Sequence, residues 1–202
     1  MNASAEPTPS TFGAFAWDET TPACYEACVR PVLDLLAPLA AQHDAELHIV
    51  DLGCGNGRLA FPAAYAMPEA MIICVDVAQS ALDQVEAAAD ALEVDNVCTA
   101  IGDGLALPGD AQGVDAVYSF GMFPEVAWPT AWGYFRAIAR ALLPGGVFRF
   151  QFVEGDQERA GDHRYPLDRV VTTLERFGLR VAEVDHGLVR DDWTFITARK
   201  AA

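Results

Sequence analysis

The stretch "VDLGCGNGRLA", from Val50 to Ala60, leaves the backbone bare at every second position, because glycines stand at 53, 55 and 57. The apolar run "LHIVDL" (47–52) in front of it predicts a buried strand, and "GRLAFPAAYAM" (57–67) predicts a helix. A glycine turn between a strand and a helix lets a ligand approach the backbone at the carboxyl end of the strand. The stretch therefore predicts a ligand site at this turn.

Strand-like and helical segments alternate over the rest of the chain, which predicts a parallel sheet with helices on both faces. We expect Ser80 to cap the helix after the second strand, and Gly145-Gly146 to end the helix at 130–143. Only a tight polar turn separates the last two strands, so these must be antiparallel neighbours. The predicted fold class is α/β: a doubly wound, mostly parallel seven-stranded sheet with a C-terminal reversed β-hairpin. The predicted strands are 47–52, 70–77, 96–103, 114–120, 147–153, 180–189 and 192–199.

Residues 1–42 do not follow the strand–helix alternation of the rest of the chain. We expect residues 1–42 to form a flexible tail followed by a helical lid segment, with Pro31 and Pro38 breaking the helix. Residues 43–202 are expected to form a single Rossmann-like ligand-binding domain.

The chain of 202 residues carries 13 basic and 29 acidic side chains, a net charge of −16. Such a surface repels phosphate backbones and anionic membranes, so we expect a small-molecule substrate, no nucleic acid and no membrane partner. The oligomeric state stays open, with a homodimer as one option.

The N-terminus lacks the basic start and apolar core of a signal peptide, and the five cysteines are an odd number. Both features favour a reducing cytoplasm. Cys24 and Cys28 share a helical spacing, but no Cys or His cluster has the spacing of metal ligands, so we expect no metal site.

The charge of the predicted crevice distinguishes between two classes of nucleotide ligand. A dinucleotide site has the pattern G-x-G-x-x-G, and Arg58 stands where its third glycine would be. Asp51, at the end of the first strand, would repel a pyrophosphate and attract a cation. Asp76 and Asp103 end the next two strands, at the same edge of the sheet. A crevice of this kind favours a positively charged nucleoside such as S-adenosylmethionine.

The order of five motifs resembles the class I S-adenosylmethionine-dependent methyltransferases over about residues 47–200. The motifs are "VDLGCGNGRLA", "CVDVAQSAL", "IGDGLALP", "VDAVYSF" and "ALLPGGVFRF". The resemblance implies a seven-stranded sheet, methyl transfer and S-adenosylmethionine as cofactor. It places the methionine part of the cofactor at the glycine turn, the ribose at Asp76, the adenine at Asp103, and the sulfonium near the end of the fourth strand. The implied cofactor-binding residues are Asp51, Gly53, Cys54, Gly55, Asp76, Val77, Asp103, Gly104, Ser119 and Phe120.

The acceptor of the methyl group is expected to be a small apolar or aromatic molecule. Phe123, Trp128 and Trp132 follow the fourth strand and are candidates for the wall of its pocket. The tetrad Asn/Asp-Pro-Pro-Tyr of amide- and base-methylating relatives is missing there. The candidate catalytic residues are Tyr25, Glu125 and His163. Tyr25 is expected as a contact of the lid over the cofactor, Glu125 as a base or substrate anchor, and His163 as a base near neutral pH.

Three other functions remain open. The domain could bind the cofactor as a regulatory module without turnover, or transfer an aminopropyl group from a decarboxylated relative of the cofactor. The second option requires a strongly acidic polyamine pocket, whereas the region after the fourth strand is aromatic. A dehydrogenase is disfavoured by Asp51 and Arg58.

Overall fold

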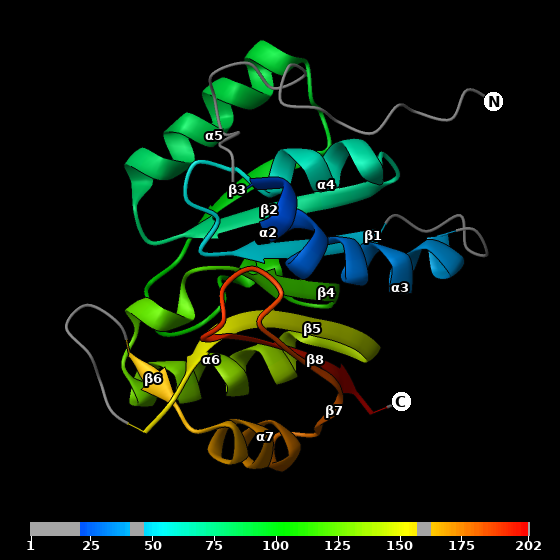
Figure 1. Cartoon of the computed structure of the whole chain (residues 1–202). Helices are drawn as coiled ribbons and strands as arrows, with labels where there is room; N and C mark the ends of the chain where they lie inside the picture. Colours follow the sequence, from blue (N-terminus) through cyan, green and yellow to red (C-terminus); the bar gives the residue numbers. More distant parts are fainter. Residues whose placement is uncertain (1–20, 41–46, 157–162, 202) are drawn as a thin grey trace.

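Seven strands cross a single sheet in the order β3-β2-β1-β4-β5-β8-β7 in the computed structural model of the chain (Figure 1). The structure describes residues 21–40, 47–156 and 163–201. The strands are β1 (Leu47–Leu52), β2 (Ala70–Asp76), β3 (Val97–Ile101), β4 (Val114–Ser119), β5 (Leu142–Glu154), β7 (Leu179–His186) and β8 (Trp193–Lys200).

The strand directions confirm the predicted sheet. β1 pairs in parallel with both β2 and β4, whereas β8 is antiparallel to both β5 and β7. In Figure 1, β1 points to the left and β8 to the right. One further strand, β6 (Arg164–Tyr165), pairs with the end of β5 inside a segment that the sequence indicated only as a polar insert. With two residues, β6 is too short to show a periodic pattern.

Helices cover both faces of the sheet. They are α2 (Thr21–Cys28), α3 (Arg30–Ala40), α4 (Ala60–Ala66), α5 (Gln79–Leu92), α6 (Trp128–Ala141) and α7 (Leu167–Arg176), with short 3-10 helices η1 (Gly109–Ala111) and η2 (Phe123–Glu125). Successive strand residues point to opposite faces, so Ile49 packs under α2–α5 while Val50 packs under α6 and α7. We call these the α2–α5 face and the α6–α7 face.

Two local expectations were wrong. α6 ends at Ala141 and the chain enters β5 directly, so Gly145 and Gly146 lie inside a strand. They accompany a register shift against β4, where a Cβ on Gly146 would lie 2.8 Å from the Leu143 carbonyl oxygen. Ser80 lies within α5, whose N-cap is Ala78.

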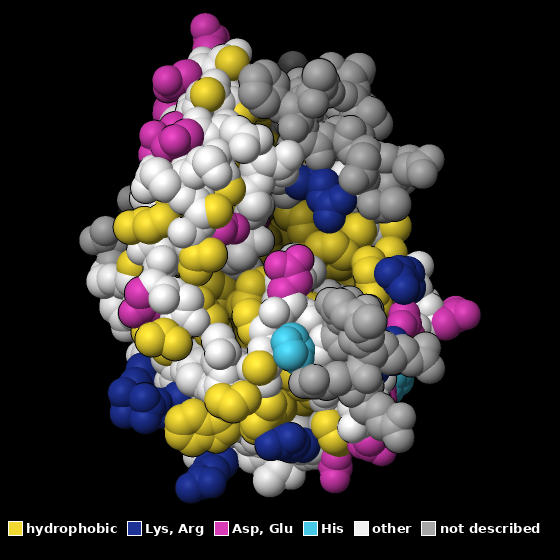
Figure 2. Space-filling model, turned by 90° about the vertical axis from the view of Figure 1, so that its left-hand side faces the viewer, with side chains coloured by type: hydrophobic (Ala, Val, Ile, Leu, Met, Phe, Trp, Pro, Cys, Tyr) yellow, Lys and Arg dark blue, Asp and Glu magenta, His cyan; other side chains and the backbone are white. Residues whose placement is uncertain are grey.

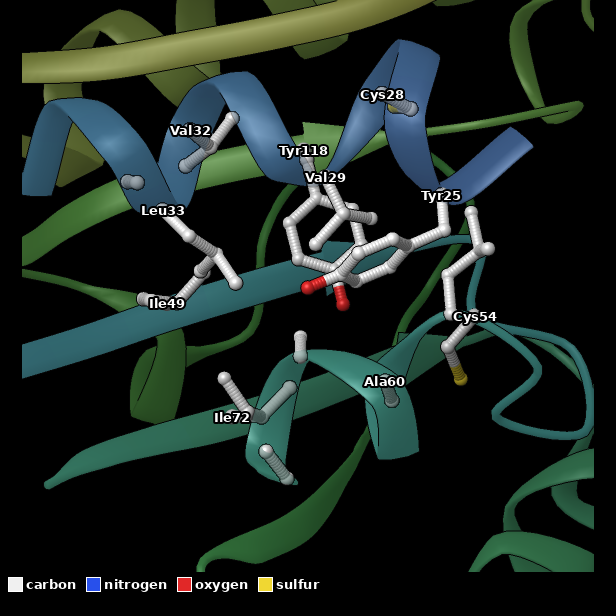
Figure 3. Packing of buried hydrophobic residues seen from close by; sticks show 14 of the residues in the cluster. Tyr25, Cys28, Val29, Val32, Leu33, Ile49, Cys54, Ala60, Ile72 and Tyr118 are labelled. Atoms are coloured by element: carbon white, nitrogen blue, oxygen red, sulfur yellow. The ribbon is translucent and has the colours of Figure 1, made fainter. Parts of the chain in front are cut away.

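The N-terminal helices are part of the core. Cys28, Val29 and Val32 are fully buried, and Figure 3 shows this segment packed over β1 and β4. The helix is interrupted between Cys28 and Arg30, just before Pro31. The expected break at Pro38 was wrong, because α3 continues through this residue to Ala40. The tail at 1–20 and the predicted boundary at 42 lie outside the described residues. Among the described helices, none has the length and apolar character needed to cross a membrane.

Candidate functional site

A cavity of about 790 Å³ lies at the carboxyl ends of β1, β2 and β4. Figure 2 looks onto this edge of the sheet and shows a hollow with an apolar floor, a basic side chain above it and an acidic one at its lower margin. Its described wall comes from the end of β1 with the glycine turn, the end of β2, the turn after β3, the residues directly after β4, and Tyr134 of α6. The lining residues used below are Asp51, Gly53, Cys54, Gly55, Arg58, Asp76, Val77, Gly102, Gly104, Phe120, Met122, Glu125, Val126 and Tyr134.

The three glycines of the turn serve two different purposes. A Cβ on Gly53 would lie 2.6 Å from the Met122 Cβ, and one on Gly57 would lie 2.8 Å from the Phe61 ring. Gly55 also has a positive φ of +53°, but a Cβ there would meet nothing within 4 Å. Gly53 and Gly57 are therefore required by packing, whereas Gly55 presents bare backbone to the open cavity.

The turn is held against the end of β2. The amides of Gly53 and Cys54 donate to the Val75 carbonyl oxygen at 2.7 and 3.1 Å. The Asp76 carboxylate accepts from the Gly55 amide through Oδ2 and from the Ala78 amide through Oδ1, both at 2.9 Å. The sequence suggested Asp76 as a ligand group. In the structure it also fixes the turn and Ala78, the N-cap of α5.

Asp51 is the most buried acidic side chain that lines the cavity, with only 3% of its surface exposed. It lies between Cys74 of β2 and Tyr118 of β4 in the strand register. Its Oδ2 accepts no hydrogen bond from any described residue. The pKa of Asp51 is raised to about 7, chiefly by burial and in smaller part by the charge of Asp76, while a hydrogen bond with Tyr118 and the charge of Arg58 offset part of the increase. A buried carboxyl group with an unused acceptor requires either a proton or a cationic partner.

Four residues of the predicted cofactor-binding and catalytic sets do not line the cavity. Asp103 is exposed, and its Oδ1 accepts from the amides of Leu105 and Ala106 at 2.8 and 2.9 Å, which lowers its pKa. Ser119 is buried and donates to the Leu52 carbonyl oxygen at 2.8 Å, which ties β4 to β1.

The other two belong to the predicted catalytic set. Tyr25 is 4% exposed within the α2–α5 core, and Figure 3 shows its ring pointing into the same space as Tyr118. The amide of His163 donates to the Pro124 carbonyl oxygen at 2.7 Å, next to η2. Of the three predicted catalytic residues, only Glu125 lines the cavity.

The expected aromatic wall is built from other residues. Phe123 is fully buried and stacks on Phe135, while Trp128 lies under the Arg169 guanidinium and Trp132 against Phe177. These three rings stabilise the α6–α7 face and do not line the cavity. Phe120 does line it, together with Tyr134, whose pKa is raised by burial and by the charge of Asp103.

Sequence reasoning missed Tyr134, Met122 and Arg58 as lining residues. For Arg58 the signal was present, since it follows Gly57 directly and was treated only as a departure from the dinucleotide pattern. Within the described segments, no group of three His, Cys, Asp or Glu side chains is placed to hold a metal ion.

Known proteins resemble this chain in the region that forms the cavity. Residues 49–146 match a family model described as "Methyltransferase domain". The ribosomal RNA large subunit methyltransferase G of Streptomyces avermitilis is 37% identical over 105 residues, which are 48% of this chain and 26% of that protein. The matched segments span only 13% to 27% of the curated relatives.

Solved structures extend the likeness to the whole fold. The magnesium protoporphyrin IX methyltransferase from Synechocystis, solved with bound S-adenosylhomocysteine, superimposes with a TM-score of 0.68 at 15% identity, covering 95% of this chain and 92% of that one. A putative sarcosine dimethylglycine methyltransferase from Galdieria sulphuraria gives 0.68 at 17% identity and covers 86% of each chain. The motif order, the sheet topology and these matches agree: residues 49–146 belong to the methyltransferase domain family, and the chain has the Rossmann-like fold of the class I S-adenosylmethionine-dependent methyltransferases.

Proposed function

We propose that this protein transfers a methyl group from S-adenosylmethionine to a small molecule. The observation that carries the proposal is the buried Asp51 carboxyl, whose Oδ2 has no partner among the described residues and which lines the same cavity as the bare backbone of Gly55. A cation that enters this cavity satisfies the carboxylate, whereas a pyrophosphate would be repelled by it.

The lining residues fit the cofactor in three parts. Asp51 would hold the ammonium group of the methionine part, with the backbone of Gly53, Cys54 and Gly55 beside it. Asp76 retains lone pairs for ribose hydroxyls while it accepts from the Gly55 and Ala78 amides.

The adenine end of the site is made by backbone and apolar surface. Val77 is 61% exposed at the end of β2, and Gly102 and Gly104 line the cavity beside it. We propose that Asp103 acts on this end by fixing the turn, because its Oδ1 holds the amides of Leu105 and Ala106.

When bound, the cofactor supplies a methyl carbon whose bond to the sulfonium breaks as a lone pair of the acceptor forms the new bond. The chain contributes alignment and exclusion of water, through the Phe120 and Met122 side chains that line the cavity. Glu125 is the residue to which we assign proton acceptance from a protonated acceptor, since Tyr25 and His163 do not line the cavity.

A small acceptor agrees with the charge of the chain. The net charge of −16 opposes binding to an RNA backbone. In addition, this chain matches only a part of the relatives that are named for ribosomal RNA methylation. The cavity volume of about 790 Å³ is in the range of small-molecule sites.

Cofactor binding is tested by replacing Gly55 with asparagine, a residue that tolerates positive φ. The new side chain would enter the cavity, so calorimetry should show at least a roughly tenfold loss of affinity for S-adenosylmethionine and S-adenosylhomocysteine. Gly113→Asn is the matched control, because Gly113 has φ +67°, equally open surroundings and no place in the cavity wall. Equal affinities in the two variants would refute the site.

The acceptor class is tested by release of S-adenosylhomocysteine. We expect release with members of a panel of small acceptors and none with large-subunit ribosomal RNA. Turnover on the RNA alone would overturn the assignment to small molecules. Tight cofactor binding without turnover on any acceptor would favour the non-catalytic alternative.

A further inference from the structure

Tyr118 of β4 lies next to Asp51 of β1 in the strand register, and both side chains belong to the α2–α5 face of the sheet. Tyr118 is fully buried and Asp51 almost so. Burial raises the pKa of Asp51, and a hydrogen bond with the nearby Tyr118 hydroxyl offsets part of that increase. Neither that hydroxyl nor Asp51 Oδ2, however, has a well-aligned partner among the described residues. A buried donor and a buried acceptor thus lie side by side, with an incomplete hydrogen bond between them.

The Tyr118 hydroxyl can act as a donor throughout the neutral pH range. Burial and the charge of Asp51 raise the pKa of Tyr118 well above its ordinary value of 10.0, so the hydroxyl keeps its proton. An O–H group donates most strongly to a carboxylate that is ionised. Tyr118 therefore favours the ionised form of Asp51, which is the form that binds a cation.

A buried cation lies in the same row of the sheet but does not neutralise Asp51. Arg149 of β5 pairs with Tyr118 in the register, so Tyr118 stands between Arg149 and Asp51. The Arg149 guanidinium donates instead to three described partners on α2, β7 and β8. The charges that act most on Asp51 are those of Asp76 and Arg58. The carboxylate therefore stays accessible to a cation that enters the cavity.

We propose that Tyr118 is a positioning residue of the cofactor site. Its hydroxyl donates to the Asp51 carboxylate while that carboxylate holds the ammonium group of S-adenosylmethionine, and its ring separates Asp51 from Arg149. Tyr118 does not line the cavity, so it acts through Asp51 and not on the cofactor directly. This inference rests on the proposed function, because it assigns the support of the carboxylate that would bind the cofactor.

Other titratable or charged groups surround the pair from α2, from β2 and from the glycine turn with the residue after it. They are Tyr25, Cys28, Cys54, Cys74, Asp76 and Arg58. Burial raises the pKa of Cys28 to about 12, and a hydrogen bond with Cys54 together with burial raises the pKa of Cys74 well above its ordinary value. Both thiols are therefore neutral near pH 7, and we assign a pH dependence in that range to Asp51.

The test measures binding of S-adenosylhomocysteine to the whole chain by calorimetry, between about pH 6 and pH 8.5. Tyr118→Phe keeps the ring and removes the hydroxyl, so the pKa of Asp51 should rise and its ionised form should become rarer. We expect a loss of affinity of about tenfold at the acidic end of this range. The loss should shrink to about threefold or less at the alkaline end, where Asp51 is ionised in both proteins.

Two comparisons isolate the contact between Tyr118 and Asp51. Tyr65→Phe is the matched control, because Tyr65 lies on α4, is 36% exposed and does not line the cavity, and it should leave affinity unchanged at every pH. In the Asp51→Asn background, Tyr118→Phe should cause no further pH-dependent loss, since the carboxylate that it supports is gone.

Thermal melting without ligand checks that the effect is not one of folding. At about pH 6, Tyr118→Phe should melt no lower than the wild type, because it removes a buried hydroxyl whose hydrogen bond is incomplete. A variant that folds as well as the wild type and still binds S-adenosylhomocysteine more weakly would support a positioning role.

The outcomes separate this inference from the proposed function. If Tyr118→Phe binds S-adenosylhomocysteine as the wild type does at every pH, the inference is wrong and the proposed function stands. The same holds if the loss is one constant factor at every pH and persists in the Asp51→Asn background, because Tyr118 is then only a packing residue. If the wild type binds neither S-adenosylhomocysteine nor S-adenosylmethionine, the proposed function itself fails.

Discussion

The two faces of the sheet bury very different side chains. Under α6 and α7, a single aromatic core of stacked and tilted rings is formed by Phe123, Phe135, Phe148 and Phe150. Under α2–α5 the strand register instead lines up a row of polar or titratable residues that runs across the sheet: Cys74, Asp51, Tyr118, Arg149 and Thr197. The cavity opens at the Asp51 position of this row.

The comparison separates stability from function. Apolar packing is non-directional, so the α6–α7 face can tolerate changes of shape at modest cost. Buried polar groups depend on specific partners, and each unsatisfied group carries a large penalty. The α2–α5 face accepts that penalty at Asp51, where the proposed cofactor would supply the missing partner.

The largest effect is expected at Arg149, which is 1% exposed. Its guanidinium donates to the Ala27 carbonyl oxygen at 2.8 Å, to Thr197 Oγ1 at 2.5 Å and to Asp185 Oδ2 at 3.0 Å, so it ties α2 to β7 and β8. Arg149→Ala should lower the free energy of unfolding by about 3–5 kcal/mol, as measured in urea. Arg140→Ala, at an exposed site, should cost no more than about 0.5 kcal/mol. Equal losses in both variants would contradict the special role of the buried row.

The next effect concerns cofactor affinity. Asp51→Asn keeps the shape of the side chain and removes its charge, so affinity for S-adenosylmethionine should fall by roughly 10- to 100-fold in calorimetry. Asp90→Asn on the exposed side of α5 is the matched control and should leave affinity unchanged. A variant at Asp51 that binds as tightly as wild type would exclude the ion pair with the cofactor.

Asp51→Asn should weaken cofactor binding, but without cofactor the same substitution should stabilise the fold. The folded pKa of about 7 lies above the ordinary value of 3.8, so the folded state holds the proton more tightly than the unfolded state. The contribution of Asp51 to stability is therefore fully present below pH 3.8 and is lost as the pH rises through 7. Relative to wild type, Asp51→Asn should gain stability between those values in urea titrations. A constant difference between the two proteins across this pH range would show that Asp51 does not titrate as expected.

Cofactor binding should depend on pH for the same reason. A cation binds the ionised carboxylate, so the affinity of the wild type should fall by up to about tenfold per pH unit below 7. Binding should also release a proton, which calorimetry detects as an enthalpy that varies with the ionisation enthalpy of the buffer. Asp51→Asn should lack both effects. Retention of the pH dependence in that variant would assign it to another group.

The smallest effect is expected on the apolar face. Phe150 is fully buried among other aromatic rings, and Phe150→Leu replaces it with a somewhat smaller side chain that stays apolar. We expect a loss below about 1.5 kcal/mol in the free energy of unfolding and no change in cofactor affinity. A large change in affinity would mean that the two faces are coupled.

Local patterns predicted much of this molecule. The alternation of apolar runs and helical segments was enough to predict the sheet and its reversed hairpin, because the periodicity of strands and helices can be recognised over a few residues. The glycine turn and the aspartates at the strand ends could also be recognised from neighbouring residues alone, because ligands bind at the carboxyl ends of the strands in this type of sheet. Asp51, Gly55 and Asp76 accordingly line the cavity.

Residues far apart in the sequence were harder to interpret. Phe120 and Trp128 are both aromatic residues after β4, yet only Phe120 lines the cavity, while Trp128 packs against Tyr165. Asp103 and Asp76 both follow strands, but the carboxylate of Asp103 is held within its own turn. No local pattern distinguishes Phe120 from Trp128, because the partners of both rings lie on other elements.

The sequence alone determined the α/β class, the strand that carries the glycine turn and the acidic character of the crevice, because each depends on neighbouring residues. Only the tertiary structure decided that Arg149 is buried under α2 and that Trp193 stands beside Phe120. Those contacts join segments more than 70 residues apart in the chain. They exist because the strand order brings β4, β5 and β8 together, and that order depends on the packing of the whole sheet.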